Sequence, residues 1–154
     1  METKFSNQMK RRFNGDEVSD DFVSASNQIE RDVIETFESK CSELQATDAW
    51  IDDLQKEKEE LSSGLEKVKS TWFEKQIQKL DTFCLGNIQK ELDPILRGAV
   101  ESLDDEMWPK IQEGYKRVVK EIMEQYKQIM TRGFRIEEEE LDENTEKIEI
   151  KINE

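Results

Sequence analysis

The stretch WPKIQEGYKRVVKEIMEQYKQIM, residues 108–130, has the most regular periodicity in the sequence and indicates the fold class. Its apolar residues recur at steps of three and four, which places them along one face of an α-helix. Gly133 follows this stripe and predicts a left-handed helix end, with Phe134 packing back over the last turn. The stripe consists of Trp108, Ile111, Tyr115, Val118, Ile122, Tyr126 and Ile129.

A longer apolar stripe precedes it and predicts a helix of some 45 residues, or about 65 Å. This helix is expected to begin at a cap formed by Thr47–Asp48 and to reach Leu92, with bends at Gly64 and Gly86. Asp93–Pro94 then predicts a break and a short new helix, because proline fits at the first helical position. The long stripe includes Ile51, Leu54, Leu61, Leu65, Val68, Trp72, Phe73, Ile77, Leu80, Cys84 and Ile88.

A further helix is expected from a cap at Ser19, with an apolar face running from Phe22 to Leu44. Before it, residues 1–18 are polar and contain the turn signal Asn14-Gly15-Asp16, so we expect a mobile arm there. The sequence therefore predicts an all-α protein, an elongated antiparallel helical bundle over residues 19–134 with long helices and disordered ends.

The C-terminal stretch, residues 135–154, has weaker periodicity and contains the acidic block Glu137–Glu140. Ile148, Ile150 and Ile152 alternate with polar residues, which is typical of a β-strand. A single strand without a partner cannot build a sheet, so a frayed tail that is dispensable for folding is the preferred interpretation.

The residues expected to matter are structural rather than catalytic, because they form the shared apolar faces of the predicted helices. Trp50, Trp72 and Trp108 are interpreted as core rather than as a ligand-stacking box. The predicted core consists of Phe37, Leu61, Leu65, Val68, Trp72, Leu80, Trp108, Ile111, Tyr115, Val118 and Ile122.

Composition argues against several classes of partner. Among 154 residues, 34% are hydrophobic and 39% charged, and the net charge is −14, so phosphate backbones would repel the chain. No apolar run approaches the roughly 20 residues of a membrane span, and no signal peptide is evident. Cys41 and Cys84 lie in apolar stripes and are expected to be reduced and buried. We expect a cytoplasmic chain without nucleic-acid partners.

Residues suited to catalysis are scarce. The sequence has no histidine, which removes the commonest general base and the commonest zinc ligand. It also contains neither a phosphate-binding loop nor a G-x-G-x-x-G turn, so no bound nucleotide is expected. Glu137–Glu140 point around the helix circumference and are not expected to converge on a cation. We therefore predict no catalytic residue, no cofactor and no metal in this chain.

An ordered set of short segments resembles one known family. Phe37–Cys41 is followed by Trp50 and Leu54, and then by the segments Leu92–Leu96 and Met107–Ile111. Gly133-Phe134 and Glu138–Glu140 close the set, which spans about residues 30 to 145. Its order and spacing resemble the helical middle domain of plant root hair defective proteins and their fungal and protist Sey-type relatives.

Members of that family are atlastin-like, dynamin-related GTPases that fuse endoplasmic reticulum tubules. The resemblance implies that this chain is part of the helical stack between a GTPase domain, which holds GTP and Mg, and a membrane hairpin. Neither of those parts is found in this sequence, and we interpret it as a fragment or a divergent relative. The implied role is a structural lever on the cytosolic face of the endoplasmic reticulum, with neighbouring helical bundles as partners.

A second hypothesis is a free-standing coiled-coil adaptor or scaffold that self-associates through the heptads between Ile51 and Trp72. The composition of the chain is equally compatible with the bundle and with the adaptor. The width of the stripe, its aromatic residues and the expected interruption at Asp93–Pro94 favour the bundle, and sedimentation would separate the two hypotheses.

Overall fold

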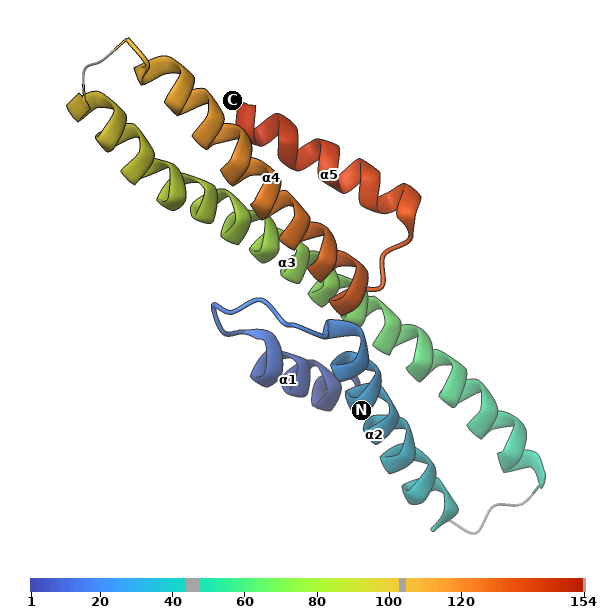
Figure 1. Ribbon diagram of the computed structural model, residues 1–154. Coiled ribbons are helices and arrows are strands. Elements are labelled where there is room, and N and C mark those ends of the chain that lie inside the picture. Colours follow the sequence, from blue (N-terminus) through green and yellow to red (C-terminus); the bar gives the residue numbers. More distant parts are fainter. Residues whose placement is uncertain (44–47, 103–104, 154) are drawn as a thin grey trace. The chain divides into compact units, whose positions relative to one another are not determined.

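The computed structural model describes residues 1–43, 48–102 and 105–153, which fold into helices α1 to α5 without a strand in these ranges. The helices are α1 (Glu2–Phe13), α2 (Phe22–Ser42), α3 (Asp48–Ser102), α4 (Met107–Gly133) and α5 (Glu138–Asn153) (Figure 1). The prediction of an all-α helical bundle is confirmed. The described helices divide between two compact units, residues Met1–Ile77 and Gln78–Glu154, and α3 contributes to both.

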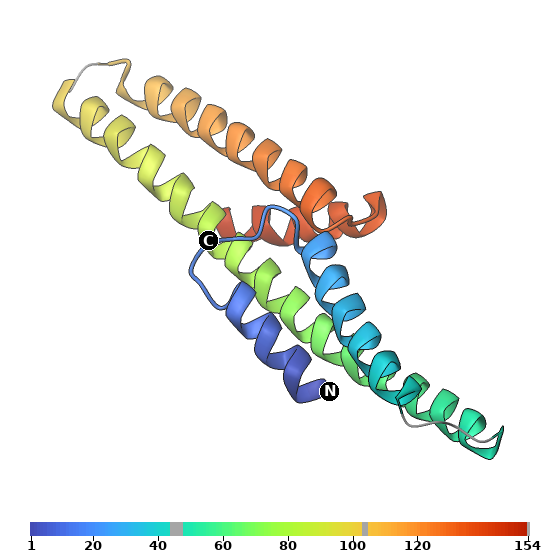
Figure 2. The same cartoon turned by 90° about the horizontal axis from the view of Figure 1, so that it is seen from below.

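In the unit Met1–Ile77, α1 and α2 pack on the N-terminal part of α3 (Figure 2). Its core contains an aromatic cluster to which each helix contributes one ring. The ring centroids of Phe13 and Phe22 are 4.8 Å apart, and those of Phe22 and Phe73 are 5.8 Å apart. Tilted and edge-on contacts of this kind stabilise aromatic cores beyond the area that they bury.

A side-chain cap determines where α2 begins. Asp21 is the N-cap, and its Oδ1 accepts a hydrogen bond of 3.0 Å from the backbone N–H of Ser24. Such a cap satisfies one of the free N–H groups in the first helical turn. The cap therefore lies two residues after the expected one at Ser19, and Phe22, the first helical residue, is fully buried.

Residues 1–18 were expected to form a mobile arm without periodicity, but Glu2–Phe13 form the helix α1. Phe5, Met9 and Phe13 recur at steps of four along this helix, and their exposed fractions are 0%, 0% and 3%. The surrounding polar residues, including Lys10 and Arg11, remain exposed. A narrow apolar face is therefore enough to hold a short basic helix against its neighbours.

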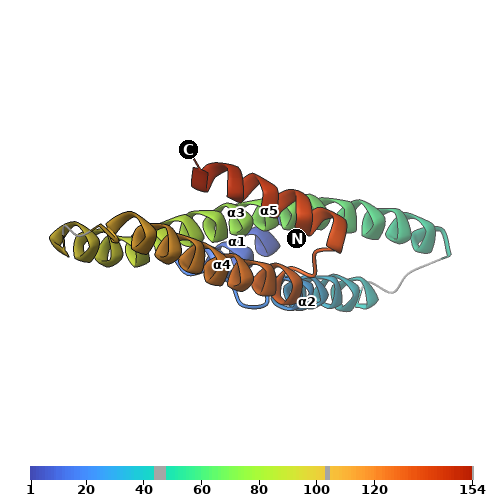
Figure 3. The ribbon, with the colours of Figure 1, turned by 45° about the horizontal axis from the view of Figure 1, so that its top comes forward.

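In the unit Gln78–Glu154, α4 runs antiparallel to the C-terminal part of α3, and α5 packs on this pair (Figures 1 and 3). The expected break at Asp93–Pro94 is absent, because α3 continues through Pro94 to Ser102. Proline removes one helical hydrogen bond. Ile95 and Ala99 on the following turn nevertheless remain partly or fully buried, which favours the continued helix.

The C-terminal stretch is also helical, so its interpretation as a frayed tail or strand is wrong. Leu141, Thr145, Ile148 and Ile152 recur at steps of four and three and give α5 a packed face. Ile148 is fully buried, whereas Ile150 on the opposite side is 55% exposed. The alternation of isoleucines therefore matched a strand only by coincidence of spacing.

The end of α4 differs from the expected glycine cap. Gly133 is the last helical residue, and no described glycine has a positive φ. Arg135 takes the left-handed conformation instead, with φ 52°. Phe134 is buried as expected, and the N–H of Ile136 donates to the carbonyl of Met130 at 3.2 Å. The chain thus turns from α4 toward α5 two residues later than the sequence indicated.

Candidate functional site: the buried polar contacts and an uncovered apolar seam

The predicted core residues fall into three groups. Leu61, Leu65, Trp72, Leu80, Val118 and Ile122 are buried as predicted. Phe37, Val68, Ile111 and Tyr115 are only partly buried, so they line the edges of the packed faces. Trp108 is 66% exposed, and its assignment to the core is wrong. It is the second residue of α4.

Gln76 on α3 is fully buried and fixes the connection between α1 and α2. Its side-chain amide donates to the carbonyl of Phe13 at 3.0 Å, and its Oε1 accepts from the N–H of Ser19 at 3.3 Å. Both polar ends of this side chain are therefore used, as burial requires. No signal in the sequence indicated this role, since an isolated glutamine has no periodic pattern.

Lys69 links α3 to α2 through an ion pair with Glu30, at 2.8 Å between Nζ and Oε2. A second carboxylate, Glu66, lies 3.2 Å from the same ammonium. Burial by itself would lower the pKa of Lys69, but its contacts with Glu30 and then Glu66 outweigh burial and raise the pKa above its ordinary value. Lys69 therefore remains charged at neutral pH.

A second polar contact joins the three helices of the unit Gln78–Glu154. The hydroxyl of Tyr126 on α4 donates to Oδ1 of Asp81 on α3 at 3.1 Å. Nζ of Lys151 on α5 donates to Oδ2 of the same carboxylate at 3.2 Å. Burial, followed by the charge of Asp81 and its hydrogen bond, raises the pKa of Tyr126 well above its ordinary value. Asp81 therefore orients α4 and α5 on α3.

Cys84 lies one turn beyond Asp81 and is buried, as expected, whereas Cys41 is partly exposed. Burial, and then the charge of Asp81, raises the pKa of the Cys84 thiol to about 12. Because the thiolate is the reactive form, the folded protein protects this side chain. Both cysteines are free thiols in the structure, as the sequence indicated.

We expect Ellman's reagent at pH 8 to modify Cys41 readily and to modify Cys84 only after unfolding. The Cys41→Ser variant should therefore show almost no fast reaction in buffer and one reactive thiol in concentrated urea. A fast reaction of this variant in buffer would contradict the burial and raised pKa of Cys84.

The end of the α3–α4 pair presents an apolar surface, which we call the uncovered seam. It consists of Leu96 and Val100 on α3 and Trp108 on α4, which are 42%, 56% and 66% exposed. Leu96 and Val100 continue the row of Leu85 and Leu92, which lies on the side of α3 that faces α5. Trp108 stands two helical turns before Tyr115 on the matching side of α4.

Truncating Trp108 to alanine is expected to change the free energy of unfolding by less than about 0.5 kcal/mol, as for most surface substitutions. Its large exposed fraction leaves little area for the truncation to lose. Urea unfolding of the wild type and the variant under identical conditions measures the difference. A loss of about 2 kcal/mol or more would place this side chain in the core after all.

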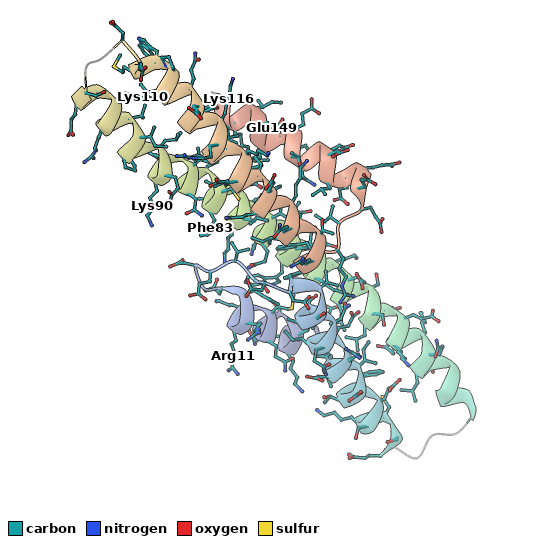
Figure 4. All side chains as sticks on the ribbon, in the orientation of Figure 1. Arg11, Phe83, Lys90, Lys110, Lys116 and Glu149 are labelled. Carbon is teal, nitrogen blue, oxygen red and sulfur yellow. The ribbon has the colours of Figure 1, made fainter. Side chains whose placement is uncertain are left out.

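Figure 4 shows Phe83 and Lys90 on the side of α3 that points away from α5, unlike the residues of the seam. Phe83 is 51% exposed but stands alone there as a large apolar side chain among polar neighbours. Exposed single apolar residues are ordinary on protein surfaces, whereas a continuous row is not.

Two properties of the described residues bear on the type of site. No group of three or more Cys, Asp and Glu side chains in these ranges is arranged to hold a metal ion. No helix in the described part of the chain combines the length and the apolar character required to cross a membrane. The contacts that the described residues do make are those of helix packing, with apolar faces, a buried amide and a carboxylate that joins three helices.

These features define a protein built from three-helix packing units. Comparison with known families finds a match to the Sey1 three-helix bundle domain over residues 1–153. The chain belongs to this family, which confirms the resemblance drawn from Phe37–Cys41, Leu92–Leu96 and Met107–Ile111. No curated protein matches the chain significantly. No solved structure matches it significantly either.

Proposed function

We propose that the chain acts as a structural lever in an endoplasmic reticulum membrane-fusion system, between a GTPase head and a membrane anchor. The match to the Sey1 three-helix bundle domain over residues 1–153 is the observation that carries this proposal. In it, the partners are neighbouring helical bundles, and GTP and Mg belong to the GTPase domain of full-length relatives. The chain itself hydrolyses no GTP and works at the cytosolic face of the endoplasmic reticulum.

The continuity of α3 supports a mechanical role. This single helix runs from Asp48 to Ser102 and supplies residues to both packing units. An unbroken helix resists bending, and rigid elements of this kind can dock against another bundle in one nucleotide state and release it in another. Within the first unit Gln76 joins α3 to Phe13 at the end of α1, and within the second Asp81 joins α3 to Tyr126 on α4.

Exchange of this segment into a full-length family member tests the proposal. The native three-helix bundle is replaced with residues 1–153, and GTP-dependent lipid mixing between vesicles is measured together with GTP hydrolysis. We expect the exchanged protein to retain both activities. Inserting a short Gly-Ser segment between Ile77 and Gln78 should leave hydrolysis in place and abolish lipid mixing, because the lever is then interrupted.

Lipid mixing that persists with the interrupted α3 would refute the lever role. A control insertion of the same length between Asp16 and Glu17, in the connection between α1 and α2, should leave lipid mixing intact because both residues are exposed and lie outside the helices. Loss of hydrolysis in every exchanged protein would instead show that the segment cannot replace its relative at all.

The alternative function is an adaptor that self-associates through the apolar stripe between Ile51 and Trp72. Leu61, Leu65 and Trp72 from this stripe are buried against helices of the same chain, which favours the bundle. Sedimentation velocity at micromolar concentration distinguishes the two: a monomer supports the bundle, and a stable dimer supports the adaptor.

A further inference from the structure

The C-terminal half of α5 has a sequence pattern that its helix does not use. From Lys147 to Ile152, which we call the alternating segment, charged residues alternate strictly with isoleucines. On the helix this spacing separates the isoleucines, so that Ile148 is fully buried and Ile150 is 55% exposed. On an extended strand all three would lie on one face and the charged side chains on the other, because successive side chains point to opposite faces.

The intrinsic preference of this stretch is for a strand, and packing keeps it helical. β-Branched residues occupy four of the eight positions from Thr145 to Ile152, and such residues lower helix propensity and raise strand propensity. Isolated helices of about 15 residues are marginal in water even when they are rich in alanine. The helix α5 has 16 residues and no alanine. It therefore depends on its buried residues Thr145 and Ile148 and on the contact of Lys151 with Asp81.

A released strand needs a partner, and the same segment of a second copy fits it. The sequence contains no other run with this alternation. In an antiparallel pair centred on Ile150, this residue faces its own equivalent, and Ile148 faces Ile152 of the second copy. On the other face Glu149 lies opposite Lys151, and opposite charges in such cross-strand pairs are stabilising. The alternating segment is therefore complementary to itself in the antiparallel direction.

We propose that the alternating segment is a latent β-strand, which pairs antiparallel with the same segment of a second copy of the chain when α5 leaves α3 and α4. Two strands alone are marginally stable, so further copies add to the free edges and the isoleucine faces of two sheets pack together. Docking of α5 therefore keeps a self-associating segment in helical form. This inference concerns self-association of the chain and does not rest on the lever role.

The acidic residues before the segment oppose this assembly and determine its dependence on salt. Residues 137–146 contain seven Asp and Glu and no Lys or Arg, and the whole chain has a net charge of −14. Charged flanks of this kind limit the aggregation of strand-forming segments. Because salt screens exposed charges beyond about 8 Å at physiological ionic strength, added NaCl should accelerate assembly once α5 is released.

Release of α5 in the intact chain tests the proposal. Thr145 is buried on α5 outside the alternating segment, so Thr145→Asp places a charge at a buried position and should undock the helix. Hydrogen exchange along α5 monitors the release, and Asp81→Asn is added if exchange stays slow, because it removes the ion pair with Lys151. We expect thioflavin T fluorescence about tenfold or more above that of the wild type, and fibre diffraction with a strand spacing of about 4.7 Å.

Two substitutions of Ile150 separate strand pairing from general instability. Valine and asparagine have similar helix propensities, but only valine keeps an apolar β-branched side chain. In the Thr145→Asp background, Ile150→Val should assemble like its parent, and Ile150→Asn should assemble about tenfold more slowly or not at all. Because Ile150 is exposed on α5, neither substitution should undock the helix of the otherwise wild-type chain. Phe83→Asn changes a similarly exposed residue on α3 and should leave the assembly rate of the Thr145→Asp chain unchanged.

Charge exchange tests the antiparallel register in the same background. Glu149→Lys places lysine opposite Lys151, and Lys151→Glu places glutamate opposite Glu149, so each variant alone should assemble more slowly than its parent. An equal mixture of the two restores opposite charges in every pair and should recover the rate. Net charge alone would predict the reverse for one variant, because Glu149→Lys makes the chain less negative and Lys151→Glu makes it more negative.

Three outcomes would overturn the proposal. Exchange along α5 is fast, yet no sheet forms at low or high salt. Alternatively, Ile150→Asn assembles as fast as Ile150→Val, in which case another segment drives association. Finally, either charge variant alone assembles as fast as its parent, in which case Glu149 and Lys151 do not face each other. None of these results depends on lipid mixing, so the lever role and the latent strand can fail separately.

Discussion

Replacement of Phe5 with alanine is expected to lower the free energy of unfolding by about 4 kcal/mol, within the usual range for a buried phenylalanine. Phe5 is fully buried on α1, together with Met9. Removing its ring leaves a cavity in a helix that has few other apolar contacts, so α1 should detach before the remainder of its unit unfolds.

Urea unfolding of the Phe5→Ala variant measures the loss, and amide hydrogen exchange of residues 2–13 shows where it occurs. Phe83→Ala is the matched control, since Phe83 is 51% exposed and its truncation should cost less than about 1 kcal/mol. Equal losses in the two variants would mean that α1 is not packed as described.

Replacement of Ile148 with alanine has the second largest expected effect, a loss of about 3 kcal/mol in the free energy of unfolding. Ile148 is fully buried on α5, and Lys151 on the next turn pairs with Asp81. The loss of its side chain removes the main apolar anchor of α5. Hydrogen exchange should therefore increase along α5 and along the faces of α3 and α4 that it covers.

Ile150 provides a control two residues away with the same side chain. It is 55% exposed, so Ile150→Ala should change the free energy of unfolding by less than about 0.5 kcal/mol. The interpretation of this stretch as a frayed tail would be restored if both substitutions had small effects and the amides of α5 exchanged fast in the wild type and in both variants.

The long helices were predictable because their apolar residues recur over many turns. The stripes from Ile51 and from Trp108 indicated α3 and α4, and the expected start of α3 at Thr47–Asp48 agrees with its observed first residue, Asp48. Thr47 itself lies outside the described residues. A sustained period of 3.6 residues is a strong signal, since loops and strands rarely reproduce it over many turns.

The two terminal helices were missed for different reasons. In α1 the signal was present, because Phe5, Met9 and Phe13 recur at steps of four. The predominantly polar composition of the surrounding residues concealed it. In α5 two patterns competed over the same residues: Ile148, Ile150 and Ile152 alternate, while Leu141, Thr145 and Ile148 follow helical spacing. Tertiary packing on α3 and α4 decides between them, and single-sequence periodicity does not contain that contribution.

The candidate site was less predictable than the fold. Trp108 belongs to the apolar row of α4 and is nevertheless 66% exposed, because the periodicity of α4 does not specify which positions of the row another helix covers. The polar contacts of Gln76 and Asp81 depend on partners 63 and 45 residues away in sequence, Phe13 and Tyr126. Such contacts follow from the fold and leave no local pattern.

The glycines of α3 and α4 show where the chain can be stabilised by engineering. A Cβ placed on Gly114 would lie 2.7 Å from Cγ2 of Ile95, so the close approach of these helices requires glycine there. Gly86 and Gly98 have nothing within 4 Å of the same added atom. Alanine at either position should raise the free energy of unfolding by up to about 1 kcal/mol, and the thermal midpoint with it, because a glycine within a helix costs chain entropy on folding. Alanine at Gly114 should lower the midpoint despite the same gain in helix propensity.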